Sequence, residues 1–348
     1  MTTTNKKVAV ALSGGLDSSV ACALLLQQGY DVVGITAKTT NSEGSEIVCQ
    51  NARKVAQKLG IEHFVLDLTQ DFQKFVIDYF ENAYKCAITP NPCIVCNQKI
   101  KWGKVFDYAI NDLKCDFIAT GHYAKIERKN GKFLLFPAED EQKDQLYYLI
   151  GLTQEHLSKT IFPLSYYKKT QIREIAQTLD LPSKSAKESQ DICFIEKPMT
   201  TKKWLFAKFG QKMGDFVLKK TKSKMGQHNG CFQYTIGQRK GIGIAYSEPL
   251  YVTEIDANSN QVFLGTKEEL FGIKCEIENL NIQDELPQNG VVMAKIRYNM
   301  PQFKAKITQE NGNYTLFFDT EQSAITKGQV CALYDINDGH LLAGGWIK

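Results

Sequence analysis

The chain has 348 residues, of which 43% are hydrophobic and 23% charged, with a formal net charge of +4. This length and composition are typical of a globular protein with two or three domains, and so small a net charge is weak support for a nucleic-acid partner by itself. No run of 18 apolar residues occurs, which excludes a membrane-spanning helix and a membrane partner. The apolar start runs into a Gly-rich turn without a signal cleavage site, so we expect a cytoplasmic protein.

The first third of the chain alternates strand patterns with helix patterns. Apolar, β-type runs predict four strands, at residues 7–12, 31–37, 63–68 and 115–123. Helical patterns that end at a glycine lie between them, at 18–29 and 47–60. This alternation predicts an α/β, doubly wound parallel sheet in a domain over residues 1–195.

The remainder of the chain has a different character. Residues 196–248 show one candidate helix, at 197–209, and then short strands, turns and loops. From residue 249 the chain is β-rich, with a hairpin about 257–260 and turns at 311–313 and 337–339. We expect a small central domain over 196–248 and a C-terminal β-barrel over 249–348.

Basic residues are bunched in four segments, at 168–173, 202–204, 219–228 and 237–241. Bunched positive charge favours a partner with a phosphate backbone. The alternative, that these are solvated surface lysines, stays open for each segment.

Residues 11–19 read ALSGGLDSS and join the first predicted strand to the first predicted helix. Glycines there allow the backbone to approach a phosphate, and a helix N-terminus offers free N–H groups to an anion. No lysine follows the glycines and the segment is not GxGxxG, so neither common nucleotide motif applies. The pattern predicts a phosphate-binding loop, and the alternative is a plain strand–helix turn.

This loop resembles that of the ATP pyrophosphatase family, whose members adenylate a substrate and release pyrophosphate. Five residues match the family's motif: Ser13, Gly14, Gly15, Asp17 and Ser18. The resemblance implies that the serines and glycines hold the phosphates of ATP and that Asp17 lies near Mg²⁺. Ala11, Leu12 and Leu16 complete the expected ATP-binding segment.

Ten cysteines in a chain without a signal peptide are expected to be reduced, and clustered ones are candidates for metal binding or catalysis. Cys93 and Cys96 form a CxxC pair, but no second CxxC supplies the four ligands of structural zinc. A third cysteine, Cys193, stands 97 residues beyond Cys96 in KESQDICFIE. The other seven are interpreted as small core residues.

An ordered set of segments resembles the bacterial tRNA 2-thiouridylases, from about residue 7 to the C-terminus. The segments are ALSGGLDSS, NPCIVCN, ATGHY, KDQLYYL, SQDICFI, YTIGQRKGIGI, KIRYN and GQVCALYD. The resemblance implies 2-thiolation of the wobble uridine of tRNAs for Lys, Glu and Gln, through an adenylate on the uracil C2 oxygen that sulfur displaces. It implies a persulfide on Cys193, supplied by a cysteine desulfurase or a persulfide carrier, and a second functional thiol at Cys96.

The resemblance also implies further binding residues. Ala37 and Gly121 match nucleotide contacts, although the family often has methionine where Ala37 stands. The target base is expected to flip out of the anticodon loop and to face Asn91, Pro92 and Cys93. The remaining matches are tRNA contacts, at His122, Lys143, Asp144, Gln145, Arg297, Tyr298 and Gln329. Lys99 and Lys101 are candidates for positive charge beside the thiols.

One position departs from the family: many members have NPDxxC, and Cys93 stands where they have aspartate. Cys93, Cys96 and Cys193 would suffice for a [4Fe–4S] cluster with one open iron, because thiolates suit such clusters. The alternatives are a persulfide relay through Cys96 and Cys193, a zinc site, or a Cys93 that only packs or forms a disulfide with Cys96. Two other functions also stay open, a related enzyme that adenylates a small molecule and a non-enzymatic zinc or redox module.

Overall fold

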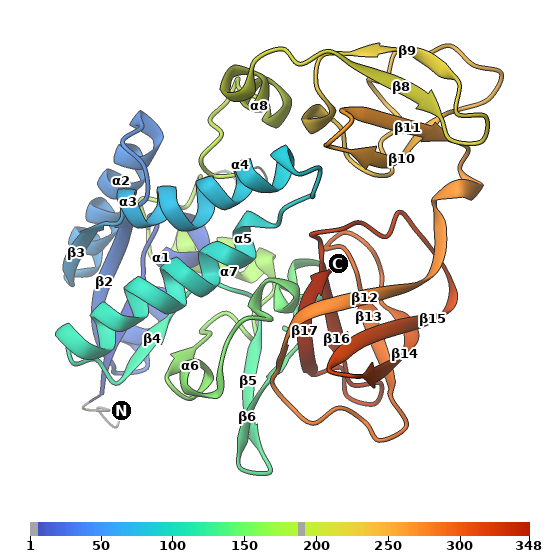
Figure 1. Ribbon diagram of the computed structural model, residues 1–348. Coiled ribbons are helices and arrows are strands. Elements are labelled where there is room, and N and C mark those ends of the chain that lie inside the picture. The colour runs from blue at the N-terminus through green and yellow to red at the C-terminus, as the bar shows by residue number, and fades with distance from the viewer. Residues whose placement is uncertain (1–5, 187–191) are drawn as a thin grey trace.

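The computed structural model describes residues 6–186 and 192–348. They form three parts: a parallel sheet with helices on its faces, a small four-stranded sheet, and a closed β-barrel near the C-terminus (Figure 1). No helix in the described ranges is long and apolar enough to cross a membrane.

The first part is built on a five-stranded sheet whose strands are all parallel. Its order is β3 (Glu62–Asp67), β2 (Asp31–Lys38), β1 (Lys7–Ala11), β4 (Phe117–Ala119) and β7 (Thr160–Ile161). The central strand is buried on both sides: Val8 and Val10 pack in one core cluster, and Ala9 packs in another. Such a continuous apolar run is what a parallel sheet covered on both faces requires. The predicted α/β fold is confirmed.

Helices cover both faces of this sheet. On one side lie α1 (Leu16–Gln27) and α2 (Glu43–Leu59), which contribute Cys22, Leu25 and Val55 to the cluster around Val8 and Val10. The opposite core takes residues from two long helical stretches that the sequence patterns did not predict. Their elements are α3 (Thr69–Phe72), a π-helix at Gln73–Ile77, α4 (Asp78–Lys85), α5 (Pro92–Cys96), and π-helices at Asn97–Val105 and Tyr108–Asp112.

Shorter elements complete this part. They are the hairpin β5 (Lys125–Lys129) and β6 (Lys132–Phe136), 3₁₀ turns at Glu141–Lys143 and Leu146–Leu149, α6 (Gln154–Ser158) and α7 (Lys169–Thr178). The hairpin reaches the barrel, where Lys132 pairs with Asp284 at 3.0 Å.

The middle part is a helix, α8 (Thr201–Phe209), and a sheet of order β10-β11-β8-β9. Its strands are β8 (Gly214–Leu218), β9 (Lys224–His228), β10 (Tyr251–Asp256) and β11 (Gln261–Gly265). The sequence prediction placed residues 249–265 in the C-terminal barrel. In the structure, β11 pairs with β8 instead, so this hairpin belongs to the middle sheet. A hairpin pattern is local and does not reveal which sheet the hairpin joins.

The C-terminal part is a closed six-stranded barrel, as expected. Its strands run in the order β12 (Phe271–Ile282), β15 (Asn313–Ser323), β14 (Phe303–Glu310), β13 (Val291–Lys295), β16 (Val330–Tyr334) and β17 (Leu341–Ile347). The β17–β12 pairing closes it. Asn311 and Gly312, between β14 and β15, both have positive φ, which is the geometry of a tight two-residue hairpin turn.

The barrel is fastened to the first part by buried polar and apolar contacts. The Asn281 side chain donates to the carbonyl oxygens of Ile150 and Leu152, at 2.7 and 3.0 Å. Gly344 is required there, because a Cβ atom would lie 2.5 Å from the Cβ of Ile150. These contacts hold the barrel against the segment at residues 150–152 of the first part.

Candidate active site

The predicted phosphate loop leaves β1 and enters α1. The Ser18 hydroxyl accepts from the Ser13 backbone N–H at 3.2 Å and donates to the Gly15 carbonyl at 3.2 Å. No side chain in the described ranges caps α1 at Gly15, so the first N–H groups of the helix remain available. Helix α1 has 12 residues, and its uncapped N-terminus directly follows the Gly-Gly turn. Such an N-terminus is suited to bind an anion such as a phosphate.

Two glycines of the expected ATP site are required by close packing. Gly14 has φ +70°, and a Cβ atom there would lie 2.5 Å from the Ala52 nitrogen in α2. At Gly121, which follows β4, a Cβ atom would lie 2.8 Å from the Ser18 nitrogen. Because β4 is the neighbour of β1, Gly121 lies directly against the start of α1. Ala37 lies near the carboxyl end of β2, the strand on the other side of β1.

Asp17, in the first turn of α1, is held by two groups from distant segments. Lys169, at the start of α7 and only 8% exposed, lies 2.7 Å from each carboxylate oxygen. The Tyr123 hydroxyl donates to Oδ1 at 2.8 Å. An ion pair and a hydrogen bond together fix the position of this carboxylate. The residue expected near Mg²⁺ is therefore a charged group with a built-in counter-ion.

The segment that leads into α5 is fixed in place by Asn91. Its side-chain oxygen accepts from the Ile94 N–H at 3.4 Å and so caps α5, and its own N–H donates to the Tyr79 hydroxyl at 3.3 Å. Pro92 occupies the first helical turn, where its missing N–H costs nothing. Cys93 is exposed and Cys96 partly exposed on this short helix.

The three candidate thiols lie in one neighbourhood. Desolvation, and then the negative charges that Cys96 and Cys93 would carry as thiolates, raise the pKa of Cys193 to about 12. Burial likewise raises the pKa of Cys96 to about 11 and raises that of Cys93. Cys193 as a residue is exposed, but its sulfur lies among protein atoms. All three thiols are therefore protonated at neutral pH in this state, and activation requires added positive charge.

Lys101 supplies positive charge to this neighbourhood, because it lowers the pKa of all three thiols. Its Nζ lies 3.4 Å from the Nε2 of His122. Burial, and then Lys101, lower the pKa of His122 well below its ordinary value, so the ring is neutral. Since a lysine ammonium only donates, Nε2 accepts, and Nδ1 carries the proton and donates to the Thr120 hydroxyl at 2.7 Å.

Two kinds of metal centre differ in the spacing that they require of these three thiols. Tetrahedral zinc with Zn–S bonds of about 2.3 Å brings its sulfurs to within about 3.8 Å of one another. The sulfurs of Cys93, Cys96 and Cys193 are not all within 4.8 Å of one another, whereas Asp335, Asp338 and His340 are the trio within the described ranges that meets this limit. A polynuclear cluster, whose ligands bind different irons, accepts a wider spacing. The three free thiols fit an iron–sulfur cluster better than a zinc ion.

The expected tRNA-contacting segment 143–145 is hydrogen-bonded to Tyr123, the residue whose hydroxyl donates to Asp17. Gln145 pairs with Tyr123 in both directions: its N–H donates to the Tyr123 carbonyl at 2.9 Å, and its side-chain oxygen accepts from the Tyr123 N–H at 3.0 Å. Asp144 accepts from the backbone of Ala138 and Leu146, yet burial raises its pKa to about 6. Lys143 precedes them and is partly exposed.

The barrel brings its own expected contacts to the same region. Gln329 donates to the Thr89 carbonyl at 3.3 Å, beside the CxxC helix. The half-buried guanidinium of Arg297 donates to the Ile236 carbonyl at 3.1 Å and so joins the barrel to the middle part. The Tyr298 ring lies 4.6 Å from that of Tyr148, centroid to centroid. The barrel thus contacts the segment before α5 through Gln329 and the middle part through Arg297.

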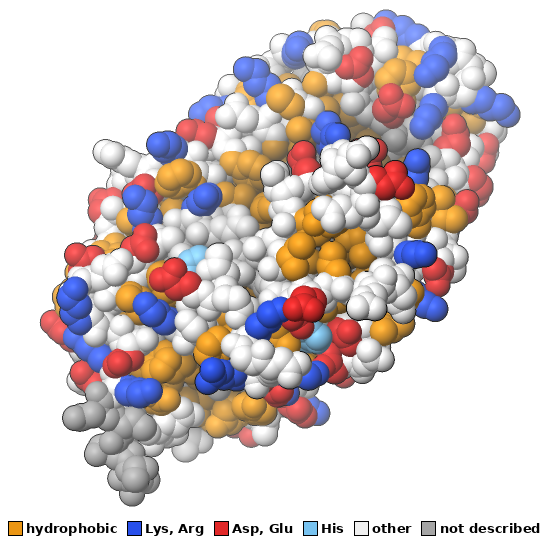
Figure 2. All heavy atoms as spheres, turned by 60° about the horizontal axis from the view of Figure 1, so that its bottom comes forward, with side chains coloured by type: hydrophobic (Ala, Val, Ile, Leu, Met, Phe, Trp, Pro, Cys, Tyr) orange, Lys and Arg blue, Asp and Glu red, His pale blue; other side chains and the backbone are white. Residues whose placement is uncertain are grey.

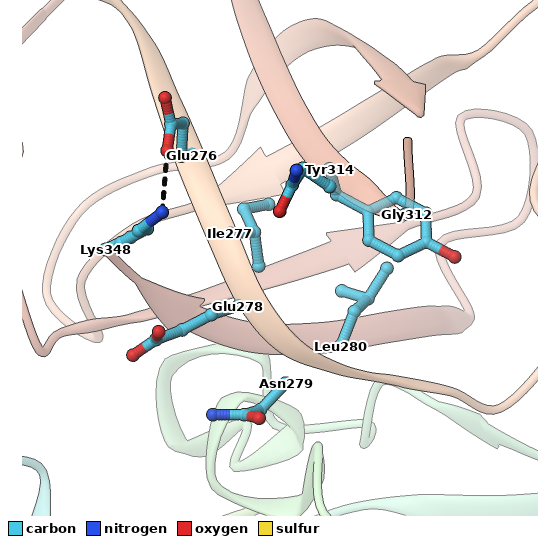
Figure 3. A pocket seen from close by; sticks show the side chains of 9 residues that line it. Glu276, Ile277, Glu278, Asn279, Leu280, Gly312, Tyr314 and Lys348 are labelled. Carbon is cyan, nitrogen blue, oxygen red and sulfur yellow. Dashed lines mark ion pairs between the residues drawn. The ribbon is translucent and has the colours of Figure 1, made fainter. Parts of the chain in front are cut away.

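A surface pocket lies apart from the candidate site. A pocket of about 250 Å³ opens on the barrel between β12, the β14–β15 turn and Lys348, with an ion pair between Glu276 and Lys348 (Figure 3). None of the expected site residues lines it.

Figure 2 shows one face of the molecule, where Lys and Arg side chains lie singly among acidic ones rather than in one continuous basic field.

Sequence reasoning assigned no role to Tyr123, Lys169 or Tyr148. Each of them lies in a segment that the sequence analysis used for another purpose. Lys169, for example, is one of the basic residues in the segment 168–173. Its partner Asp17 is 152 residues away, so no local pattern reveals the pairing. A lysine at the start of an amphipathic helix would have been the one available signal.

Comparisons with known proteins agree with this three-part chain. Family models match in order: the tRNA methyl transferase HUP domain at residues 6–197, the tRNA methyl transferase PRC-barrel domain at 202–266, and the aminomethyltransferase beta-barrel domain at 273–347. A solved structure, the U34-tRNA thiolase NcsA from Methanococcus maripaludis with its [4Fe-4S] cluster, is more distant. It is 22% identical, with a TM-score of 0.36 over 54% of this chain and 61% of that one.

Curated relatives match over their full length. The tRNA-specific 2-thiouridylase MnmA of Clostridium acetobutylicum is 42% identical over 99% of both chains. The tRNA-specific 2-thiouridylase MnmA 1 of Fusobacterium nucleatum is 40% identical over 99% of this chain and 94% of its own. Identity at this level, along all three parts and over nearly the whole of both relatives, shows that the chain belongs to the tRNA-specific 2-thiouridylase family.

Proposed function

We propose that the protein is a tRNA sulfurtransferase that uses ATP to convert the wobble uridine of tRNAs for Lys, Glu and Gln to 2-thiouridine. The observation that carries the proposal is that one α/β part holds both a phosphate loop, which includes Asp17, and a group of three thiols. The barrel lies next to this part. Its site of action is the cytoplasm, where we expect the tRNA and the sulfur donor.

The first step is adenylation. The uracil C2 oxygen attacks the α-phosphorus of ATP and pyrophosphate leaves, which turns a poor leaving group into a good one. In this proposal the N–H groups at the start of α1, with Ser13 and Ser18, would bind the phosphates, and Asp17 would hold Mg²⁺. The ion supplies charge neutralisation for the phosphates, and carboxylate oxygen is a ligand that it prefers.

The second step is sulfur transfer. The terminal sulfur of a persulfide on Cys193 attacks C2 and AMP leaves. The Cys96 thiolate then attacks the Cys193 sulfur, so that a Cys96–Cys193 disulfide forms and the bound sulfur stays on C2 as the thiocarbonyl. An external thiol reduces the disulfide and restores the pair. Lys101 stabilises the thiolates in this step.

An iron–sulfur cluster is the alternative route for the same sulfur. Cys93, Cys96 and Cys193 would hold it, and it would supply an iron at which sulfide binds. Cys93, which replaces the aspartate of many relatives, is free and exposed and suits either route.

The test is thiolation of a transcript of the anticodon stem-loop by the full-length protein with ATP, Mg²⁺, a cysteine desulfurase and cysteine. We expect 2-thiouridine at the wobble position by mass spectrometry, and its loss in Asp17→Ala with stem-loop binding retained. AMP formation from ATP that depends on a small molecule, without any 2-thiouridine, would instead favour the small-molecule alternative.

A further inference from the structure

Two tyrosines from different parts of the chain form an open aromatic pair beside the CxxC helix. Tyr148 lies in the 3₁₀ turn Leu146–Leu149, and Tyr298 follows β13 of the barrel. Their ring centroids are 4.6 Å apart with an interplanar angle of 39°, so the rings form a wedge rather than a closed stack. Both side chains are partly exposed.

The position of the pair is set by contacts to the CxxC helix. The Asn97 side chain, directly after Cys96, donates to the Tyr148 carbonyl at 2.9 Å. The neighbouring Tyr147 is buried instead and donates to the Val330 carbonyl of the barrel at 3.0 Å. Tyr147 therefore anchors the turn, and Tyr148 stays partly exposed next to the CxxC helix.

The surroundings of Tyr148 agree with this orientation. Burial raises the pKa of its hydroxyl, and the next contribution comes from Cys93, so the phenol and that thiol lie in one neighbourhood. On the barrel side, the Lys295 ammonium lies 5.3 Å from the centre of the Tyr298 ring. The wedge is thus bordered by a thiol at one end and a cation at the other.

We propose that Tyr148 and Tyr298 form a stacking platform for the flipped uracil, with Tyr148 orienting the ring so that its C2 faces the cysteines. The inference rests on the proposed function and adds a binding residue to it. A flipped base loses its neighbours in the stack, and an aromatic ring replaces them at about 1–3 kcal/mol per base. Uracil is small and uncharged, so a flat ring next to the sulfur gives it both affinity and orientation.

The experiment is a thermodynamic cycle on the full-length protein with the α,β-methylene analogue of ATP. The Kd is measured for an anticodon stem-loop with uridine at the wobble position and for one that is abasic there, in the unchanged protein and in Tyr148→Leu, Tyr148→Phe and Tyr166→Leu. Tyr166, which is 67% exposed, is the matched control. Thermal melting shows whether each variant is folded.

We expect the unchanged protein to prefer uridine over the abasic site by about 5- to 150-fold. Tyr148→Leu should bring this ratio close to one and raise the KM for the stem-loop, whereas Tyr148→Phe and Tyr166→Leu should keep the ratio within about twofold. A ratio that Tyr148→Leu leaves unchanged, in a protein that still makes 2-thiouridine, overturns the platform and leaves the proposed function intact. A protein that makes no 2-thiouridine from any stem-loop overturns both.

Discussion

The Lys169 ammonium lies 2.7 Å from both carboxylate oxygens of Asp17, although 152 residues separate them in the chain. Lys169 is buried at the start of α7, and α7 packs against α1, which carries Asp17. Without nucleotide the pair neutralises two charges next to the phosphate loop. If Asp17 holds Mg²⁺ as proposed, Lys169 would be released from the carboxylate and would be available to the phosphates of ATP.

Lys169→Met should therefore slow adenylation by about 10- to 100-fold, because it removes a charge-assisted contact to the phosphates. It should also lower the melting temperature, since Asp17 loses its counter-ion in a partly buried position. AMP release with stem-loop and ATP, and thermal melting, measure the two effects. Lys168→Met is the control, because Lys168 is exposed and adjacent. Equal activity of the two variants would contradict a role for Lys169 at the phosphates.

The thiols lead to a second prediction, which separates adenylation from sulfur transfer. Cys193→Ser and Cys96→Ser should each reduce 2-thiouridine formation by at least about 100-fold, because a serine hydroxyl neither carries a persulfide nor reduces one. AMP formation should continue in both variants. Cys86→Ser should behave like the unchanged protein, since Cys86 is also exposed but lies outside the group. Undiminished 2-thiouridine in Cys193→Ser would remove the persulfide step.

Cys93 discriminates between the two routes for sulfur. The protein is purified without oxygen, iron and sulfide are measured, and Cys93→Asp is compared with it. If the thiols act as a relay, Cys93→Asp should retain activity with a persulfide donor and neither protein should contain iron. If they hold a cluster, the unchanged protein should contain about four irons per chain, and Cys93→Asp should lose iron and activity together.

The parallel sheet, the phosphate loop and the barrel could be predicted from the sequence. Each depends on a hydrophobic periodicity or a turn motif that neighbouring residues encode. Gly14 and Gly15 fall between an apolar strand and a helix, and Asn311 and Gly312 make a hairpin turn. The sequence did not reveal that β11 joins β8, or that Lys169 meets Asp17, because these contacts depend on tertiary packing. The π-helices after Cys96 were also missed, since their winding departs from the period that patterns are compared with.

Asp144 gives a pH-dependent prediction with a definite sign. Burial raises the pKa of this carboxyl from 3.8 to about 6, so between these values the folded protein holds a proton that the unfolded chain has lost. The contribution of Asp144 to the free energy of unfolding is then fully present below about pH 4 and is lost as pH rises through 6, by about 1–3 kcal/mol. Asp144→Asn has no proton to lose, although its single oxygen replaces only one of the two carboxylate oxygens that accept from the Ala138 and Leu146 N–H groups.

The stability of Asp144→Asn relative to the unchanged protein should therefore increase from pH 4 to pH 7. Urea denaturation at several pH values measures the difference, and Asp112→Asn, at an exposed carboxyl, provides the control. A difference that stays constant over this range would mean that the carboxyl is ionised in the folded protein throughout. In that case the causes that lower the pKa of Asp144, which are the Ala138 and Leu146 N–H groups and then the Lys295 charge, together offset its burial. Segment 143–145 would then offer the tRNA an ionised carboxylate at pH 6 instead of a half-protonated one.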